Sequence, residues 1–146
     1  KINIKEKMKK LFSDLKLKSG DYLVIQGETI GPDIQKNKYL VKDYDFFIYN
    51  VKIVSKDKTV EYNPKEIETM LSLLKVDLKM VPILAEKRIN ELEKFNDYIK
   101  SRGWDIMSRL NPKMIMEGVV VRAMNQNATR FKSFKYINKE FLLKEE

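Results

Sequence analysis

The sequence contains no cysteine and no histidine among its 146 residues. These absences exclude a disulfide scaffold, a zinc finger, a thiol-based redox centre and any catalytic triad that depends on histidine. General acid–base chemistry would therefore fall to Asp, Glu, Lys or Tyr side chains. No apolar run approaches the ~18 residues that cross a bilayer, and no signal peptide precedes the first predicted strand. We therefore expect no membrane segment and a cytoplasmic protein.

Low-complexity linkers and internal repeats are also lacking, so we expect a single unit over residues 1–146, with a basic helical lead-in at 1–20. A hydrophobic fraction of 43% is ordinary for a globular protein and too high for a disordered one. The length corresponds to one domain or part of one.

The charge is strongly positive, with a net value of +8 and an isoelectric point near 9.5. Such a balance favours polyanionic partners, of which nucleic acid is the commonest. The basic residues gather towards both ends of the chain, especially in residues 1–18 and 122–144. A solvated, lysine-rich surface explains the same charge equally well, so the charge indicates a class of partner and no more.

Hydrophobic periodicity and turn residues predict helices and strands in an order where strands repeatedly follow strands. Helices are expected at 4–17, 63–74, 86–101 and 140–144, and strands at 22–30, 46–54, around 60, 79–84, 114–123 and 130–137. The sequence Asn63-Pro64-Lys65-Glu66 is a strong helix start, with Asn as the N-cap. Because crossover helices are few, we expect an α+β fold of mostly antiparallel sheets with flanking helices.

Two segments of the first half suggest ligand chemistry. In residues 27–39, Glu28 lies between two glycines at a strand end, where backbone and carboxylate can both approach a ligand. In residues 45–51, alternation places Phe47 and Tyr49 on the more apolar face of a strand, with Val51 and Ile53. Aromatic rings so placed can stack on a purine. The plainer alternatives are a Gly-Pro turn and ordinary core packing.

Two segments of the second half carry charge in unusual positions. Glu117 opens a valine-rich strand, where a carboxylate needs a partner such as a divalent cation, a ribose hydroxyl or a lysine. In residues 130–136, alternation places Lys132 on one face with Phe134 and Tyr136, and Lys135 on the other face with Ser133 and Ile137. A lysine on the inner face of such a strand suits phosphate oxygens. The alternatives are an exposed glutamate in a turn and an edge-strand lysine that opposes aggregation.

The order of these four segments resembles the covalent nucleotidyltransferase superfamily of DNA ligases, RNA ligases and capping guanylyltransferases. The wording of the motifs is similar to that of ATP-dependent RNA ligases. The resemblance rests on Gly-Glu-x-x-Gly-Pro-x-Ile-Gln-x-Asn-x-Tyr at 27–39, Val-Pro-Ile-Leu at 81–84, Glu-Gly-Val-Val-Val-Arg at 117–122 and Ser-Phe-Lys-x-Ile-Asn-x-x-Phe-Leu-Leu-Lys at 133–144. It extends over essentially all of residues 27–144.

The resemblance implies a ligase reaction. In that family a lysine within Lys-x-Asp-Gly attacks the α-phosphate of ATP and forms lysyl–AMP, and AMP then passes to a 5′-phosphate of RNA. A neighbouring 3′-hydroxyl displaces AMP and seals the strand. Such a lysine needs a depressed pKa to react as a nucleophile. The implied cofactors are ATP, which supplies AMP, and Mg²⁺ or Mn²⁺, and the implied partner is RNA with 5′-phosphate and 3′-hydroxyl ends.

The resemblance also implies roles for individual residues. Glu28 matches a glutamate that contacts the nucleotide ribose or the metal, and Tyr49, or else Phe47, matches the aromatic residue that stacks on adenine. Glu117 matches a catalytic carboxylate associated with the metal and the nucleophile. Lys135 matches a catalytic lysine that contacts the AMP phosphate, and Lys132 is a second candidate for that phosphate. Many relatives have Lys-x-Lys in the last motif, whereas this chain has Ser133 two residues before Lys135.

The nucleophile motif is absent, because none of the five glycines follows an aspartate. Lys18-Ser19-Gly20-Asp21 is only a scrambled version of it. We therefore expect a nucleotidyltransferase domain whose front portion is missing and which does not adenylylate itself. The alternatives are a DNA ligase or capping-type enzyme and a non-catalytic, basic nucleic-acid-binding module.

Overall fold

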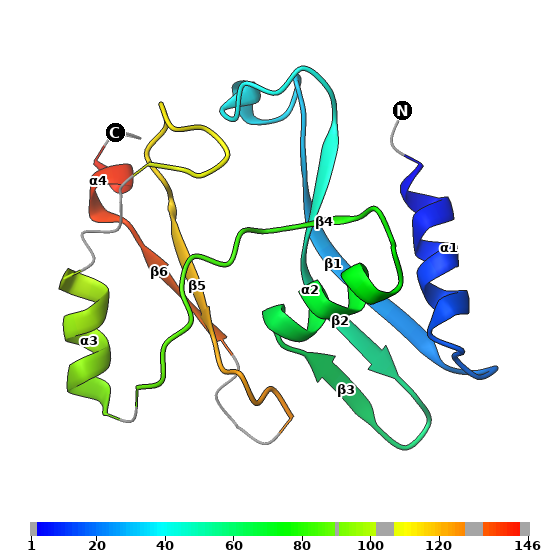
Figure 1. The fold of residues 1–146 in the computed structure, drawn as a ribbon. Coiled ribbons are helices and arrows are strands. Elements are labelled where there is room, and N and C mark those ends of the chain that lie inside the picture. The colour runs from blue at the N-terminus through cyan, green and yellow to red at the C-terminus, as the bar shows by residue number, and fades with distance from the viewer. Residues whose placement is uncertain (1–2, 90, 102–106, 128–132, 144–146) are drawn as a thin grey trace.

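The structure is a computed structural model that describes residues 3–89, 91–101, 107–127 and 133–143. It confirms an α+β fold built mostly from antiparallel pairs (Figure 1). The elements in chain order are α1 (Ile4–Asp14), β1 (Tyr22–Ile30), a 3-10 turn η1 (Gln35–Asn37), β2 (Asp45–Val54), β3 (Thr59–Tyr62), α2 (Pro64–Leu73), β4 (Lys79–Met80), α3 (Leu92–Ser101), β5 (Gly118–Arg122), β6 (Ser133–Ile137) and α4 (Lys139–Leu142).

The strands form two separate sheets. In the larger sheet β1, β2 and β3 pair antiparallel in that order, and β4 pairs with β2 in parallel. The smaller sheet is the antiparallel pair of β5 and β6. Figure 1 shows this pair beside the larger sheet, with α3 and α4 on its far side and the segment after β4 running across from one sheet to the other. Among the residues that the structure describes, no helix has the length and apolar character needed to cross a membrane.

The hydrophobic core belongs to the larger sheet. Helices α1 and α2 contribute Leu11 and Ile67, and β2 contributes Ile48 and Val51, all with 0% exposure. The predicted start of α2 is confirmed, because Asn63 and Glu66 form a reciprocal capping box on either side of Pro64. Capping fixes where the helix begins, and its buried face then holds it on the sheet.

The predicted apolar face of β2 is wrong at one point, because the strand contains a β-bulge. Gln26 of β1 pairs with Asn50, whereas the next residue, Gly27, pairs with Ile48, so Tyr49 has no partner in the register. The extra residue shifts the alternation, and Ile48 and Val51 both enter the core. Phe47 and Tyr49 therefore lie outside the core cluster that contains Val51, with which they were expected to share a face.

Several predicted boundaries also differ: the first helix ends at Asp14 rather than 17, and the strand expected from 114 begins at Gly118. The strand expected at 79–84 pairs only over Lys79–Met80, and after Val81 donates to the Ile48 carbonyl the ladder ends at Pro82, which has no N–H. The helix expected from 86 begins instead at Leu92. A start at 86 would place Lys87 and Arg88 against Glu86 at the positive end of the helix dipole, whereas the observed first turn balances Lys94 with Glu93.

Candidate functional site

A cluster of charges forms where β5 begins. Glu117 directly precedes β5, and its carbonyl accepts a hydrogen bond of 2.8 Å from the Asn138 amide. Its carboxylate forms an ion pair with Lys135 of β6. The Lys38 ammonium lies 4.0 Å from the other carboxylate oxygen of Glu117. Glu117 is thus flanked by two lysines that come from distant parts of the chain.

The glycine after Glu117 allows a close approach of β5 to β6. A Cβ on Gly118 would lie 2.1 Å from the Tyr136 carbonyl oxygen, which no side chain tolerates. Glycine at position 118 is therefore required by the local structure. It allows β5 to pair closely with β6, and this pairing brings Lys135 within reach of Glu117.

Lys38 is held by a loop with an unusual backbone. Gln35, Lys36 and Asn37 all have positive φ, from 47° to 55°, a conformation that costs energy for residues other than glycine. The Asn37 side chain closes the loop through two hydrogen bonds of 2.9 Å to the Val41 backbone. The buried Asn111 donates 2.8 Å to the Lys38 carbonyl from another loop. Tertiary contacts thus impose this conformation.

Tyr39 connects Glu28 with the Glu117 cluster. Burial raises the pKa of the Tyr39 hydroxyl above its ordinary value, and the negative charges of Glu28 and Glu117 raise the pKa further. Both carboxylates therefore act on the ionisation of the same hydroxyl. The Lys38 ammonium lies 5.6 Å from the centre of the same ring. The site thus joins the end of β1, the loop after it and the start of β5.

Aromatic side chains border the site on the larger sheet. Phe47 is the cross-strand partner of Glu28, so both side chains lie on one face of the sheet. The Lys79 ammonium, paired with Asp45, lies 5.7 Å from the centre of the Phe47 ring. Tyr49, at the bulge, is 45% exposed.

The smaller sheet presents an exposed apolar and basic face. Phe134 packs edge-on against Phe95 of α3, so its strand neighbour Lys135 points to the opposite face. Val120 is paired with Lys135 and is 62% exposed, which is high for a valine inside a strand. Arg122, two residues further on the same face as Val120, donates 2.6 Å to the Tyr49 carbonyl. That face therefore lies towards β2.

This arrangement suits a nucleotide bound with a divalent cation. Aromatic and aliphatic surfaces can take a base, and an ammonium can take a phosphate. In the described part of the chain, no three acidic side chains gather closely enough to hold a metal by themselves. A hard cation that keeps waters and shares phosphate oxygens needs only one or two carboxylates, so the carboxylate of Glu117 fits such an ion.

The predicted site residues fall into three groups. Glu117 and Lys135 meet directly, and Glu28 acts with Glu117 on the pKa of Tyr39. Phe47 and Tyr49 border the site from β2. Lys132 lies outside the described residues.

Sequence reasoning assigned no role to several residues that belong to this region, namely Lys38, Tyr39, Lys79, Val120 and Arg122. All but Lys79 lie inside a quoted motif, Lys38 at an unspecified position and the others at named ones, so the signal was present without a geometry to interpret it. The position of Val120 follows from alternation once the face of Lys135 is known. The roles of Lys79 and Arg122 could not be assigned without knowing which strands are neighbours.

Comparisons with known structures give the class of protein that this fold and site define. Two variants of the Naegleria gruberi RNA ligase match with a TM-score of 0.71, one solved with AMP and Mn at 27% identity and one with ATP and Mn at 26%. The same ligase solved with pyrophosphate also matches, with a TM-score of 0.71 and 27% identity. Each match covers 96% of this chain and 38% of the relative. The fold is thus that of the RNA ligase nucleotidyltransferases.

The family follows from the sequence. The family model for RNA ligase matches residues 1–137, so the chain belongs to the RNA ligase family. A comparison with curated proteins returned no significant match. The chain spans about two fifths of the length of the solved ligases that it resembles.

Proposed function

We propose that this chain is the C-terminal portion of an RNA ligase catalytic domain that joins RNA through lysyl–AMP and RNA-adenylate intermediates. Its substrates would be ATP and RNA with 5′-phosphate and 3′-hydroxyl ends. The observation that carries the proposal is the pairing of Glu117 with Lys135, with Lys38 at 4.0 Å, beside the exposed Val120 on a strand face that lies towards the aromatic strand β2. The solved relatives were obtained with AMP, ATP and Mn, which supports the same ligands here.

Each residue has a role in this proposal. Lys135 binds the AMP phosphate in place of its present partner Glu117. Tyr49 or Phe47 stacks on adenine, and Val120 packs on the base from the other side. Glu117, with Glu28 nearby, holds Mg²⁺ or Mn²⁺, which when bound neutralises phosphate charge. Because the chain contains no Lys-x-Asp-Gly, we expect no covalent transfer of AMP to the chain itself.

Calorimetry with AMP and adenosine tests the proposal on this chain. Only AMP carries a phosphate, so Lys135→Met should weaken AMP binding about tenfold, as for a lost hydrogen bond between charged groups, and leave adenosine unchanged. Lys139→Met is the matched control, because Lys139 is exposed on α4 and should change neither affinity.

The metal role needs a second titration. Mn²⁺ should tighten AMP binding in the wild type, and Glu117→Gln should remove that effect while leaving AMP binding without metal at least as strong, because the change frees Lys135. No AMP binding by the wild type, or equal losses for Lys135→Met and Lys139→Met, would overturn the proposed function.

A further inference from the structure

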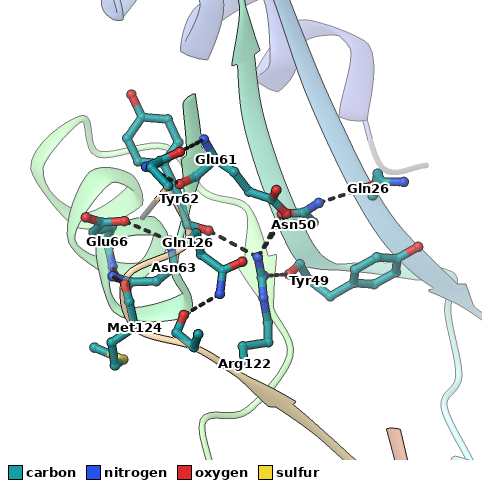
Figure 2. Close-up of polar contacts among 12 residues, drawn as sticks. Gln26, Tyr49, Asn50, Glu61, Tyr62, Asn63, Glu66, Arg122, Met124 and Gln126 are labelled. Atoms are coloured by element: carbon teal, nitrogen blue, oxygen red, sulfur yellow. Dashed lines mark hydrogen bonds and ion pairs between the residues drawn. The ribbon is translucent and has the colours of Figure 1, made fainter. Parts of the chain in front are cut away.

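A buried arginine joins the two sheets behind the candidate site. Arg122 ends β5, and its side chain is only 10% exposed. The guanidinium donates four hydrogen bonds. They are 2.6 Å to the Tyr49 carbonyl, 3.0 Å to the Asn50 side chain, 3.3 Å to the Tyr62 carbonyl and 3.4 Å to the Glu61 carboxylate. Figure 2 shows these contacts converging on the one guanidinium. One side chain of the smaller sheet thus contacts two strands of the larger sheet.

The strongest of these contacts coincides with the β-bulge. Tyr49 is the residue that the pairing of β1 with β2 leaves without a partner, and its carbonyl is the acceptor nearest to Arg122. Asn50, the other residue of the bulge, also donates 2.8 Å to the Gln26 side chain on β1. A bulge re-aims the side chain of the extra residue, so contacts that hold the bulge also hold the direction of the Tyr49 ring.

The charge of Arg122 is balanced where it lies. Burial lowers the pKa of the guanidinium, and the neighbouring Glu61 carboxylate opposes that shift. Arginine stays protonated under all ordinary conditions, and its planar fork serves several acceptors at once, which a lysine ammonium cannot match. The position therefore requires the geometry of arginine and not only its charge.

We propose that Arg122 is a positioning residue that holds Tyr49 at the adenine site and locks the strand that follows Glu117 onto the aromatic strand. This inference rests on the proposed function, because it assumes that adenine binds beside Tyr49. This role explains why Arg122 directly follows the Glu-Gly-Val-Val-Val run. The four hydrogen bonds of its guanidinium described above all lie in the seam between the two sheets.

Adenosine binding separates positioning from a purely structural role. Arg122→Lys keeps the charge beside Glu61 but cannot serve all four acceptors, and we expect adenosine affinity to fall about tenfold, as for lost hydrogen bonds to a charged group. Asn127→Ala is the matched control, because Asn127 crosses the same seam through hydrogen bonds of 3.0 and 3.1 Å to the Glu61 backbone without contact to Tyr49. Its adenosine affinity should stay within about twofold of the wild type.

A double-mutant cycle tests the route of the effect. If Arg122 acts through Tyr49, then Arg122→Lys should weaken adenosine binding no further in a Tyr49→Ala background. Fully additive losses, or equal losses for Arg122→Lys and Asn127→Ala, would overturn the positioning role.

A ligand-free readout separates this inference from the proposed function. In NMR spectra, the amide and ring signals of Tyr49 and the Asn50 amide should shift in Arg122→Lys and stay in place in Asn127→Ala. Unchanged Tyr49 signals in Arg122→Lys would refute the positioning role. If these shifts occur in Arg122→Lys but the wild type binds no adenosine, the proposed function is refuted and the positioning of Tyr49 by Arg122 is not.

Discussion

The two sheets of this protein are built on different principles. In the larger sheet, Ile48 and Val51 of β2 are completely buried beneath α1 and α2. In the smaller sheet, no residue of β5 or β6 within the described strands is fully buried, and Val120 is largely exposed. The smaller sheet depends instead on the Phe95–Phe134 contact and on the polar seam around Arg122. Hydrophobic burial stabilises one sheet, and hydrogen bonds attach the other.

This difference separates stability from ligand binding. A face that binds a nucleotide cannot also be filled by the protein's own side chains, so its apolar groups remain exposed in the free protein. Regions with few buried contacts also open most easily. We therefore expect the smaller sheet to unfold locally before the larger one, and substitutions in the two sheets to affect different properties.

The largest effect on stability is expected at the seam. Arg122→Met removes the ion pair with the buried Glu61 carboxylate and the hydrogen bonds to Tyr49, Asn50 and Tyr62, and breaking a buried pair in this way costs about 3 kcal/mol or more. Urea unfolding measures this loss, and hydrogen exchange should show β5 and β6 losing protection first. Arg122→Met with Glu61→Gln should recover part of the loss. If the unfolding free energy of Arg122→Met alone lies within about 1 kcal/mol of the wild-type value, the seam is not needed for stability.

A matched pair of valines sharpens the comparison. Val51 is 0% exposed in β2, so Val51→Ala should cost about 2 kcal/mol of unfolding free energy through lost burial and the cavity left behind. Val120 is 62% exposed in β5, so Val120→Ala should change the unfolding free energy by less than about 0.5 kcal/mol and weaken AMP binding instead. Equal costs in urea unfolding would remove the distinction between the two sheets.

The smallest expected effect is a change in the pKa of Tyr39, at the junction between the sheets. The pKa of Tyr39 is raised by burial and by Glu28 and Glu117, so Glu28→Gln should lower that pKa towards its ordinary value of about 10. Glu68→Gln, on the exposed face of α2, is the control and should leave the Tyr39 pKa unchanged. NMR titration of the tyrosine rings measures it. If the Tyr39 pKa is the same in Glu28→Gln as in the wild type, the Glu28 carboxylate lies outside the site.

The same shift has a consequence for stability. Because the pKa of Tyr39 is higher in the folded state, its contribution to stability is fully present below pH ~10 and is lost as the pH rises through the folded-state value. Glu28→Gln should therefore reduce this part of the alkaline stability loss.

Local patterns predicted most of the fold but not how its parts meet. The capping box at Asn63 and the alternation around Lys135 depend on neighbouring residues only, and both are confirmed. The bulge at Tyr49 was missed because it depends on how β1 pairs with β2. Arg122 was missed for the same reason, since its acceptors lie 60 to 73 residues away in the sequence.

The residues of the site were predicted from the sequences of the motifs. How those residues are arranged could be known only from the structure. Glu28, Glu117 and Lys135 were chosen by resemblance, and the connection through Tyr39 became visible only with the loop after β1 in place. Lys38 was overlooked because its approach to Glu117 depends on a strained loop and on Asn111.

The central claim is that both sheets build one nucleotide site, and an NMR titration with AMP and Mg²⁺ tests it most directly. We expect the amides of Glu28, Tyr39 and Tyr49 on the larger sheet and of Val120 and Lys135 on the smaller sheet to shift together, with one common dissociation constant. Shifts confined to one sheet, or none at all, would contradict the claim.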